Sequence, residues 1–376
     1  SSDNLRQFVS RIEKEKPPLA QIDKYLITED PINIGSIGSL NCFYIKQTEE
    51  SISETHSKIP PDLLPCKDCL AEFKDITNRR FHYPFINCTN CGPRYSIIEG
   101  LPYDRIRTSM KVFKMCKACQ AEYLNPNDRR YHAEPISCFH CGPTLKLLNH
   151  KNNILAKNNE ALALASHLIS KGYILGLKGV GGFQIIVDAL NTRAAETLRR
   201  NKNRKSKPFA VMMQNIDQVK AFCEVSLTEE KMLTSSSGPI VLLKVKNIAN
   251  EISLNASPQN PYLGVMLPSS PLHILLLDGL KTPLIVTIGN LQNEPICISN
   301  EEAMERLSKI TDYFLIHNRS IERPLDDSLV QFVQNNQITL RAGRGFSPQY
   351  FDIKNPQKKS LIALGPQMKN TIAFVN

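Results

Sequence analysis

The chain has 376 residues and a formal net charge of +10, from 46 lysines and arginines against 36 aspartates and glutamates. Its 41% hydrophobic and 22% charged residues exclude a disordered or fibrous protein and indicate about two or three globular domains. The positive charge favours anionic partners such as nucleotides, phosphate esters or RNA. No apolar run approaches the ~20 residues of a membrane span and no signal-like leader opens the sequence, so we expect a cytoplasmic protein without a membrane partner.

The first 60 residues are polar and too few for an independent core of ordinary size. Residues 41–46 alternate between apolar and polar side chains, which predicts a short strand there.

Eight of the eleven cysteines form four Cys-x-x-Cys pairs, which begin at Cys66, Cys88, Cys116 and Cys138. Two thiolates at this spacing reach one tetrahedral metal ion, and two pairs complete a closed zinc site. Because the sequence shows no secretory leader, we favour zinc over a disulfide framework. We expect the three remaining cysteines to be buried thiols: Cys42, Cys223 and Cys297.

The cysteine region is an internal repeat with a period of 50 residues. The copies begin at Cys66 and Cys116, and residues 79–80 (Arg-Arg) recur as residues 129–130. We therefore expect two zinc ions, each held within one repeat, although pairing across the repeats stays open. Histidine ligation is disfavoured because four sulfurs already fill each site. The predicted ligands are Cys66, Cys69, Cys88, Cys91, Cys116, Cys119, Cys138 and Cys141.

Residues 144–158 form a polar sequence that we interpret as a linker. Beyond it, apolar spacing predicts a helix over 160–171, and Asn191 predicts the cap of the next helix. Ser-x-x-Glu capping boxes at Ser226 and Ser299 predict two more helices. The predicted strands span 173–177, 184–187, 208–212, 240–244, 284–287, 313–316, 328–333 and 338–341. This alternation predicts an α/β (α+β) domain, a twisted mixed sheet with flanking helices.

Six of the nine residues from Arg199 to Lys207 are cationic, at the predicted end of a helix. Such a cluster can clamp a triphosphate, but a solvated basic surface is an equal alternative. Gly181 and Gly182 allow a ligand to approach the backbone closely, or mark a simple turn. Residues 287–290 follow an apolar strand, where ligands of α/β proteins often bind, although a turn explains them equally well.

Two further groups favour structural roles. His273 lies in an apolar run and is expected to be a core histidine rather than a catalyst. Residues 326–327 (Asp-Asp) are expected to be solvated rather than to hold magnesium.

Several segments, together with the cysteine array and its Cys-Gly-Pro endings, match one known family. They are GVGGFQIIVDA from Gly179, KSKPFAVM from Lys205, LGVMLPSSPLHILLL from Leu263, EPICISNEEA from Glu294 and LDDSLV from Leu325. These segments resemble the HypF family of hydrogenase maturation carbamoyltransferases, and the resemblance covers essentially all of residues 60–376.

The resemblance implies four parts. Residues 1–60 resemble the tail of an acylphosphatase-like domain and a linker, and residues 61–150 a duplicated zinc-finger module. Residues 151–350 resemble a YrdC-like nucleotide-binding domain, and residues 351–376 a linker and the start of a truncated carbamoyl-transfer domain.

In this family the YrdC-like part uses ATP with magnesium to convert carbamate, released from carbamoyl phosphate, into carbamoyl-adenylate. The carbamoyl group then passes to the C-terminal cysteine of HypE. The resemblance therefore implies an enzyme, incomplete in this chain alone, with no nucleic acid among its expected partners. Two alternatives stay open: an RNA-binding zinc and YrdC-like module, and a degenerate scaffold without catalysis.

Lys202 and Arg204 resemble the family's Lys-x-Arg pair, which implies catalytic cations on the triphosphate or the carbamate. The predicted nucleotide-binding residues are Gly181, Gly182, Lys207, Thr287, Gly289, Asn290, Ser328 and Arg341. Three positions depart from the family pattern: Ile288 replaces a serine, Pro324 an arginine and Gln184 a histidine. Because isoleucine cannot donate a hydrogen bond, we expect reduced activity or a shifted pocket.

Overall fold

The computed structural model describes residues 2–16, 22, 58–247, 250–350, 360–365 and 372–375. The chain divides into two compact units, Ser1–His56 and Ser57–Asn376. The first unit contributes helix α1 (Ser2–Lys14). The strand expected at 41–46, and Cys42 within it, lie outside the described residues.

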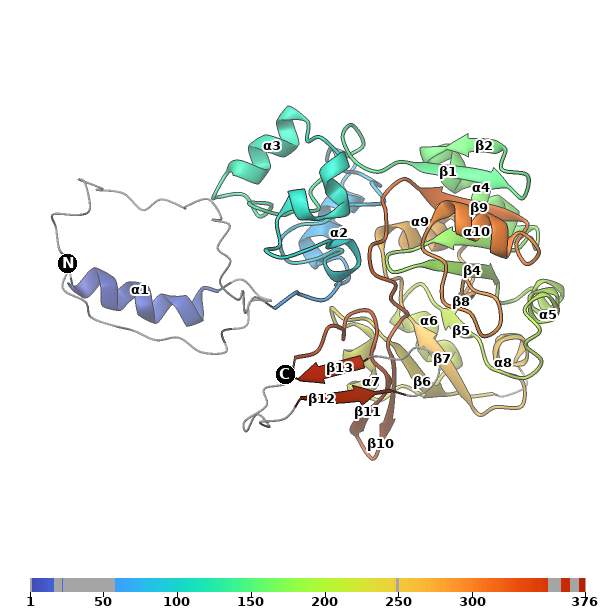
Figure 1. Cartoon of the computed structure of the whole chain (residues 1–376). Helices are drawn as coiled ribbons and strands as arrows, with labels where there is room; N and C mark the ends of the chain where they lie inside the picture. Colours follow the sequence, from blue (N-terminus) through green and yellow to red (C-terminus); the bar gives the residue numbers. More distant parts are fainter. Residues whose placement is uncertain are drawn as a thin grey trace. The chain divides into compact units, whose positions relative to one another are not determined.

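The second unit contains the cysteine repeats and a large sheet (Figure 1). Its described helices are α2 (Lys67–Lys74), α3 (Lys117–Leu124), α4 (Asn158–Ser170), α5 (Thr192–Asn201), α6 (Ile216–Phe222), α7 (Leu227–Leu233), α8 (Glu251–Ala256), α9 (Pro271–Leu280) and α10 (Asn300–Leu307). Its strands are β1 (Leu145–Asn149), β2 (Ile154–Lys157), β3 (Leu175–Lys178), β4 (Phe183–Asp188), β5 (Ala210–Met212), β6 (Ile240–Lys244), β7 (Tyr262–Met266), β8 (Leu284–Ile288), β9 (Tyr313–His317), β10 (Leu329–Val333), β11 (Asn336–Arg341), β12 (Leu361–Leu364) and β13 (Ile372–Val375). Among the described helices, none combines the length and the hydropathy that crossing a bilayer requires.

The two cysteine repeats share one local plan. In each, the first cysteine occupies the N-cap position of a short helix, Cys66 at α2 and Cys116 at α3. After the helix, the backbone turns through a histidine in the left-handed region, with φ of 55° at His82 and 50° at His132. Histidine tolerates this region better than bulky or β-branched residues do, which accounts for a histidine at this place in both repeats.

The sheet is mixed, as the sequence predicted. Its strand order is β11-β10-β6-β7-β5-β8-β4-β3-β9-β1-β2, and β12 and β13 form a separate antiparallel pair. The pairs β3–β9, β5–β7 and β6–β10 are parallel, whereas the other neighbours are antiparallel. The strands predicted between residues 173 and 341 are confirmed to within a few residues at each end, whereas β1, β2, β7, β12 and β13 were not predicted.

The interpretation of residues 144–158 as a linker is wrong. This segment forms β1 and β2, and β1 pairs with β9 to extend the sheet, with Leu145 opposite His317 and Leu147 opposite Leu315. Leu145 and Leu147 are buried. Their alternation is a strand signal that the surrounding lysines and asparagines obscured.

Helix starts follow the predicted caps closely. The side chain of Asn191 accepts a hydrogen bond at the start of α5, and Ser226 forms a full capping box with Glu229. At α10 the cap is partial, because Glu302 accepts from the backbone N–H of Ile298 rather than of Ser299.

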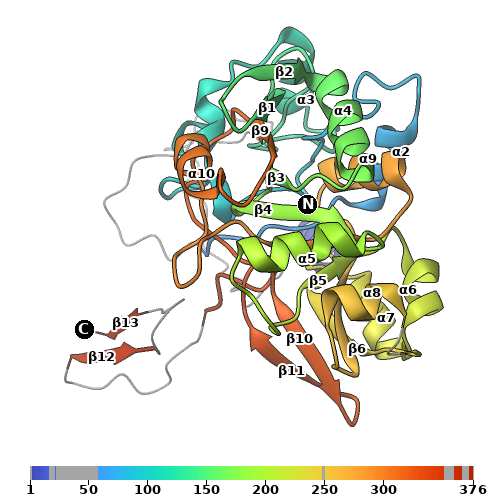
Figure 2. The same cartoon turned by 90° about the vertical axis from the view of Figure 1, so that its right-hand side faces the viewer.

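Different elements pack on the two faces of the sheet. On one face, Val241, Val265 and Ile285 pack in a core cluster with α5 and α8. Figure 2 shows α5 lying across the sheet near β4 and β5. On the other face, α4, α9 and the first cysteine repeat pack over the strands at one end, in a cluster that includes Cys69 and Phe85.

Candidate functional site

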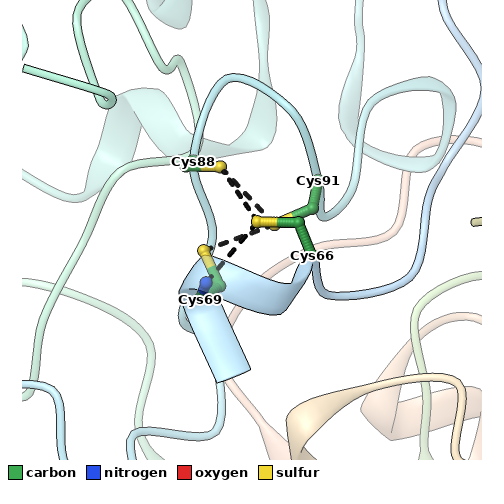
Figure 3. A group of neighbouring side chains, drawn as sticks. All are labelled: Cys66, Cys69, Cys88 and Cys91. Carbon is green, nitrogen blue, oxygen red and sulfur yellow. Dashed lines mark hydrogen bonds between the residues drawn. The ribbon is translucent and has the colours of Figure 1, made fainter. Parts of the chain in front are cut away.

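The four sulfurs of the first repeat point toward one another (Figure 3). The Sγ atoms of Cys66 and Cys88 lie 3.6 Å apart, those of Cys69 and Cys91 3.5 Å, and those of Cys88 and Cys91 3.8 Å. A tetrahedral zinc ion with Zn–S bonds of about 2.3 Å places its sulfurs about 3.8 Å apart, whereas a disulfide needs about 2 Å. The first repeat therefore fits a four-thiolate zinc site.

The second repeat has the same arrangement. The sulfurs of Cys116 and Cys138 lie 3.8 Å apart, those of Cys138 and Cys141 3.8 Å, and those of Cys119 and Cys141 3.5 Å. Each group thus gathers within one repeat, and neither four-sulfur group includes a histidine.

The surroundings of the two centres differ. Cys69, Cys88 and Cys91 belong to the core cluster that the first repeat shares with the sheet. The second repeat has a small cluster of its own, and its Cys116 and Cys141 are only partly buried. The first centre is therefore part of the junction with the sheet, whereas the second is more open to solvent.

A cavity of about 390 Å³ opens on the sheet face opposite α5 and α8. This volume suits a small-molecule site. Alternate residues of the strands form its apolar floor, because Ile240 and Leu242 point into the cavity while Val241 and Leu243 point into the core. Its other apolar lining residues include Gly264, Met266, Val286 and Leu329.

The rim of this cavity is cationic and carries Arg204, Lys207 and Arg341. Burial, together with the charges of Arg199 and Arg341, lowers the pKa of Arg204 to about 10. Within the part of the chain that the structure describes, no carboxylate forms an ion pair with these three rim cations. An anionic ligand would relieve this repulsion.

Arg204 is held in a defined orientation. Its guanidinium donates to Thr287 Oγ1 at 3.2 Å, to the backbone oxygen of Lys207 at 3.1 Å and to that of Pro208. It also lies 4.8 Å from the centre of the Phe209 ring. The cation at the rim is therefore positioned by neutral groups and keeps its charge available for a ligand.

Lys202 does not line the cavity. Its ammonium group donates to the backbone oxygens of Ile288 and Asn290, at 2.9 and 2.8 Å, and to Asn290 Oδ1 at 3.2 Å. Burial, together with the charge of Arg204, lowers the pKa of Lys202 to about 8. Lys202 thus ties the end of α5 to the loop after β8.

Three other predicted residues support the walls. A Cβ added to Gly289 would lie 2.6 Å from the Cβ of Phe183, so this close approach requires glycine. Ser328 is buried, and its hydroxyl donates to Arg344 O and accepts from Gly343 N. The third, Asn290, accepts from Lys202 as described above. The structure thus places Arg204, Lys207, Thr287 and Arg341 at the cavity, and Lys202, Gly289, Asn290 and Ser328 behind it.

A smaller cavity, of about 20 Å³, adjoins the first, and Gln184, Ile288 and Asp327 line both. Gly181 and Gly182 line the smaller cavity. A Cβ on Gly181 would lie 2.5 Å from Leu325 O, so this glycine is needed for packing of the turn itself.

A buried polar network, which the sequence did not reveal, connects these cavities. Gln184 Nε2 donates to Asp327 Oδ2 at 3.0 Å, and Asp327 Oδ1 accepts from Arg344 at 2.9 Å. The amide oxygen of Gln184 lies 2.8 Å from His273 Nε2, so the neutral histidine donates to it. Asp327 is therefore not the solvated carboxylate that we expected. His273 is buried, as expected for a core histidine, and burial lowers its pKa to about 4.

The three departures from the family pattern have distinct surroundings. Gln184 belongs to the network described above, and Ile288 lines both cavities. Pro324 is exposed, and the neighbouring Arg323 extends toward the first repeat. Arg323 lies over the Tyr95 ring and donates to Ile98 O, so it contacts the first repeat.

Two family models match the chain. The HypF finger model matches residues 66–98 and 115–148, and the Sua5, YciO and YrdC model, described as telomere recombination, matches residues 167–343. The finger matches cover the two cysteine repeats and extend into β1, and the second model covers the sheet from β3 to β11.

The chain is also similar to curated carbamoyltransferases. It is 46% identical over 370 residues to the carbamoyltransferase HypF of Synechocystis sp., covering 98% of this chain and 47% of that protein. It is 40% identical to the probable carbamoyltransferase HypF of Methanocaldococcus jannaschii, covering 99% of this chain and 48% of that protein. The chain thus spans about half the length of these relatives.

The chain is also similar to solved structures of HypF proteins. A full-length HypF in its phosphate- and nucleotide-bound form superposes with a TM-score of 0.91 at 41% identity, covering 99% of this chain and 48% of that one. The HypF of T. kodakarensis gives a TM-score of 0.88 at 39% identity, covering 100% and 47%. The identity over nearly the whole chain, the HypF finger matches and the superposition on HypF structures show that the chain belongs to the HypF family of carbamoyltransferases.

Proposed function

We propose that this chain is the adenylating portion of a HypF-type carbamoyltransferase. It binds ATP with magnesium in the 390 Å³ cavity and joins carbamate to the nucleotide, with carbamoyl-adenylate and pyrophosphate as products. Residues 61–150 are the zinc-finger module and residues 151–350 the nucleotide domain. Residues 1–60 and 351–376 belong to the neighbouring acylphosphatase-like and carbamoyl-transfer domains.

One observation carries this proposal: cations without carboxylate partners, among the described residues, lie above an apolar floor. Arg204, Lys207 and Arg341 provide charge for a triphosphate, and the floor offers a surface for a base. The nucleotide-bound HypF structure, which superposes over nearly the whole chain, supports the same assignment.

The chemistry requires positioning and charge neutralisation more than proton abstraction. A carbamate oxygen attacks the α-phosphorus of ATP, the bond from that phosphorus to the bridging oxygen breaks, and pyrophosphate leaves with the electron pair. The rim cations offset the charge that accumulates on the phosphates, and Arg204 is oriented for this role in advance. Magnesium, bound with ATP, shares the phosphate charge.

We also propose that two zinc ions are structural, one in each four-cysteine group. Four thiolates leave no open coordination position for a substrate, so each ion contributes folding free energy rather than chemistry. Elemental analysis should find two zinc ions per chain.

The proposed partners follow from the other domains of HypF-type proteins. Carbamoyl phosphate supplies carbamate through the acylphosphatase-like domain, and the carbamoyl group passes to HypE through the transfer domain. The chain by itself should therefore neither hydrolyse carbamoyl phosphate nor carbamoylate HypE. Turnover of either reaction would overturn the proposed domain assignment.

Calorimetry with ATP and magnesium tests the central assignment, and carbamate-dependent exchange of pyrophosphate into ATP tests the chemistry. Saturable ATP binding with exchange supports the adenylating function. An absence of binding at millimolar ATP favours the scaffold without catalysis. RNA binding with a steep salt dependence, in place of ATP binding, favours the RNA module.

A further inference from the structure

Each cysteine repeat reaches into the metal centre of the other. Arg129, in the second repeat, has its Nη1 3.2 Å from the Sγ of Cys69 in the first. Arg79, in the first repeat, has its Nη2 3.4 Å from the Sγ of Cys119 in the second. The two contacts are equivalent under the 50-residue repeat, so they are a property of the pair and not of one copy.

A glutamate on the opposite helix fixes each of these arginines. Arg129 pairs with Glu72 of α2 at 2.7 Å, and Arg79 pairs with Glu122 of α3 at 2.7 Å. The guanidinium is thus held between a carboxylate and a thiolate that both belong to the other repeat. A planar group with several N–H donors is suited to such a double contact.

The adjacent arginines strengthen the same crossing. Arg130 also pairs with Glu72 and donates to the backbone oxygen of Asn87 at 3.0 Å. Its counterpart Arg80 does the same in the other direction, with Glu122 and Ser137. Both Arg80 and Arg130 are buried. Neither repeat could keep these groups paired if the other lost its fold.

The physical consequence concerns the metal. Four thiolates around one Zn²⁺ leave a net charge of about −2, and a donated N–H disperses part of it. Outer partners of this kind orient ligands, and their loss typically costs about 10–100-fold in metal affinity. Arg79 contacts the second centre but lies on residues 74–88, a loop closed by the first centre. Arg129 contacts the first centre but lies on residues 124–138, a loop closed by the second centre.

We propose that Arg79 and Arg129 are crossed positioning residues and that the two centres bind zinc cooperatively. An ion in the second centre orders the loop that places Arg129 against Cys69, and an ion in the first does the same for Arg79 and Cys119. The coupling is reciprocal, because each ion must change the affinity for the other by the same factor. This inference rests on the proposed zinc content of the chain.

Zinc release from the whole chain to a chromogenic chelator tests the coupling. Cys138→Ser leaves only the first centre intact and Cys88→Ser only the second. The remaining ion of each variant should leave about tenfold faster than either ion leaves the parent chain. Release at the parent rate from both variants would show that the centres are independent. Elemental analysis and ATP calorimetry on the parent report separately on the zinc content and on the proposed function.

Cadmium-113 resonances of the fully loaded chain test the crossing itself. The resonance that survives in Cys138→Ser identifies the first centre. Arg129→Gln should shift that resonance and leave the other in place, and Arg79→Gln should do the reverse. A purely structural role would not produce this crossed pattern. A shift at the centre of the arginine's own repeat, or no shift, would overturn the proposal.

Two variants serve as matched controls. Arg129→Lys keeps the charge but not the planar group, so it should retain zinc better than Arg129→Gln does. Lys117→Gln removes an exposed charge next to Cys116 and should change neither the resonances nor the release rates. An equal effect of Lys117→Gln and Arg129→Gln would assign the coupling to net charge and overturn the specific contact.

Discussion

The ammonium nitrogen of Lys202 lies 2.8 Å from the backbone oxygen of Asn290. This contact, with those to Ile288 O and Asn290 Oδ1, engages all three N–H donors of the lysine. The cation that the family resemblance places on the substrate thus fixes the loop after β8. Its effect on the cavity is indirect, through the position of Thr287 and Ile288.

We predict that Lys202→Met destabilises the chain by about 1–3 kcal/mol, because buried acceptors lose their donor. ATP affinity should fall with it, since the loop that carries Thr287 loosens. Urea unfolding and calorimetry measure the two effects. If stability is unchanged while ATP affinity drops tenfold or more, Lys202 contacts phosphate directly.

Arg204→Ala should weaken ATP binding at least tenfold. A charge-assisted contact to phosphate contributes roughly 1.5–3 kcal/mol, and about 1.4 kcal/mol already corresponds to tenfold. The matched control is Arg200→Ala, which removes an exposed cation from the same basic run, where its guanidinium contacts Thr197. Calorimetry on both variants should separate a specific clamp from a general basic surface. Equal losses in the two variants would contradict the clamp.

The side chain at position 288 should tune the nucleotide site, since Ile288 lines both cavities. We predict that Ile288→Ser tightens ATP binding or raises carbamate-dependent exchange, because a hydroxyl can donate to a ligand where isoleucine cannot. Ile288→Ala removes similar bulk without the hydroxyl, and should not reproduce the gain. If alanine and serine behave alike, the effect comes from volume and not from a hydrogen bond.

Local sequence patterns predicted what local geometry determines. The Asn191 cap, the Ser226 capping box and the strand Ile240–Lys244 each depend on a few neighbouring residues, and the structure has them as expected. The 50-residue repeat also implied that metal ligands gather within each copy, which follows from duplication rather than from the fold.

Contacts between distant side chains could not be predicted in this way. His273 and Gln184 are 89 residues apart in the chain, and Gln184 and Asp327 are 143 apart. Gln184 lies on β4, His273 on α9 and Asp327 just before β10, so their meeting depends on how these distant elements pack. For the same reason the sequence showed the cationic run as a cluster. It did not show that the side chain of Lys202 points to the loop after β8 while that of Arg204 points to the cavity.

The buried network should make stability sensitive to acid. Burial holds the pKa of His273 at about 4, below the value of about 6.5 expected in the unfolded chain. Between these values the unfolded chain binds more protons than the folded one, so stability falls as the pH falls from about 6.5 toward 4. From about pH 7 to about pH 5, these pKa values predict a loss of about 2 kcal/mol from this residue.

His273→Gln removes this titration while leaving an amide that can donate to Gln184. We predict that the variant is less stable than the parent at about pH 7, because its amide fits the site of the buried ring less well. Its stability should also fall less between about pH 7 and about pH 5. Urea unfolding of both chains at the two pH values gives the difference of slopes. Thiolate protonation and zinc loss at low pH affect both chains alike, as does His317, whose pKa burial also lowers. Equal slopes would mean that His273 takes up its proton in the folded chain at about the same pH as in the unfolded chain, and that burial does not lower its pKa.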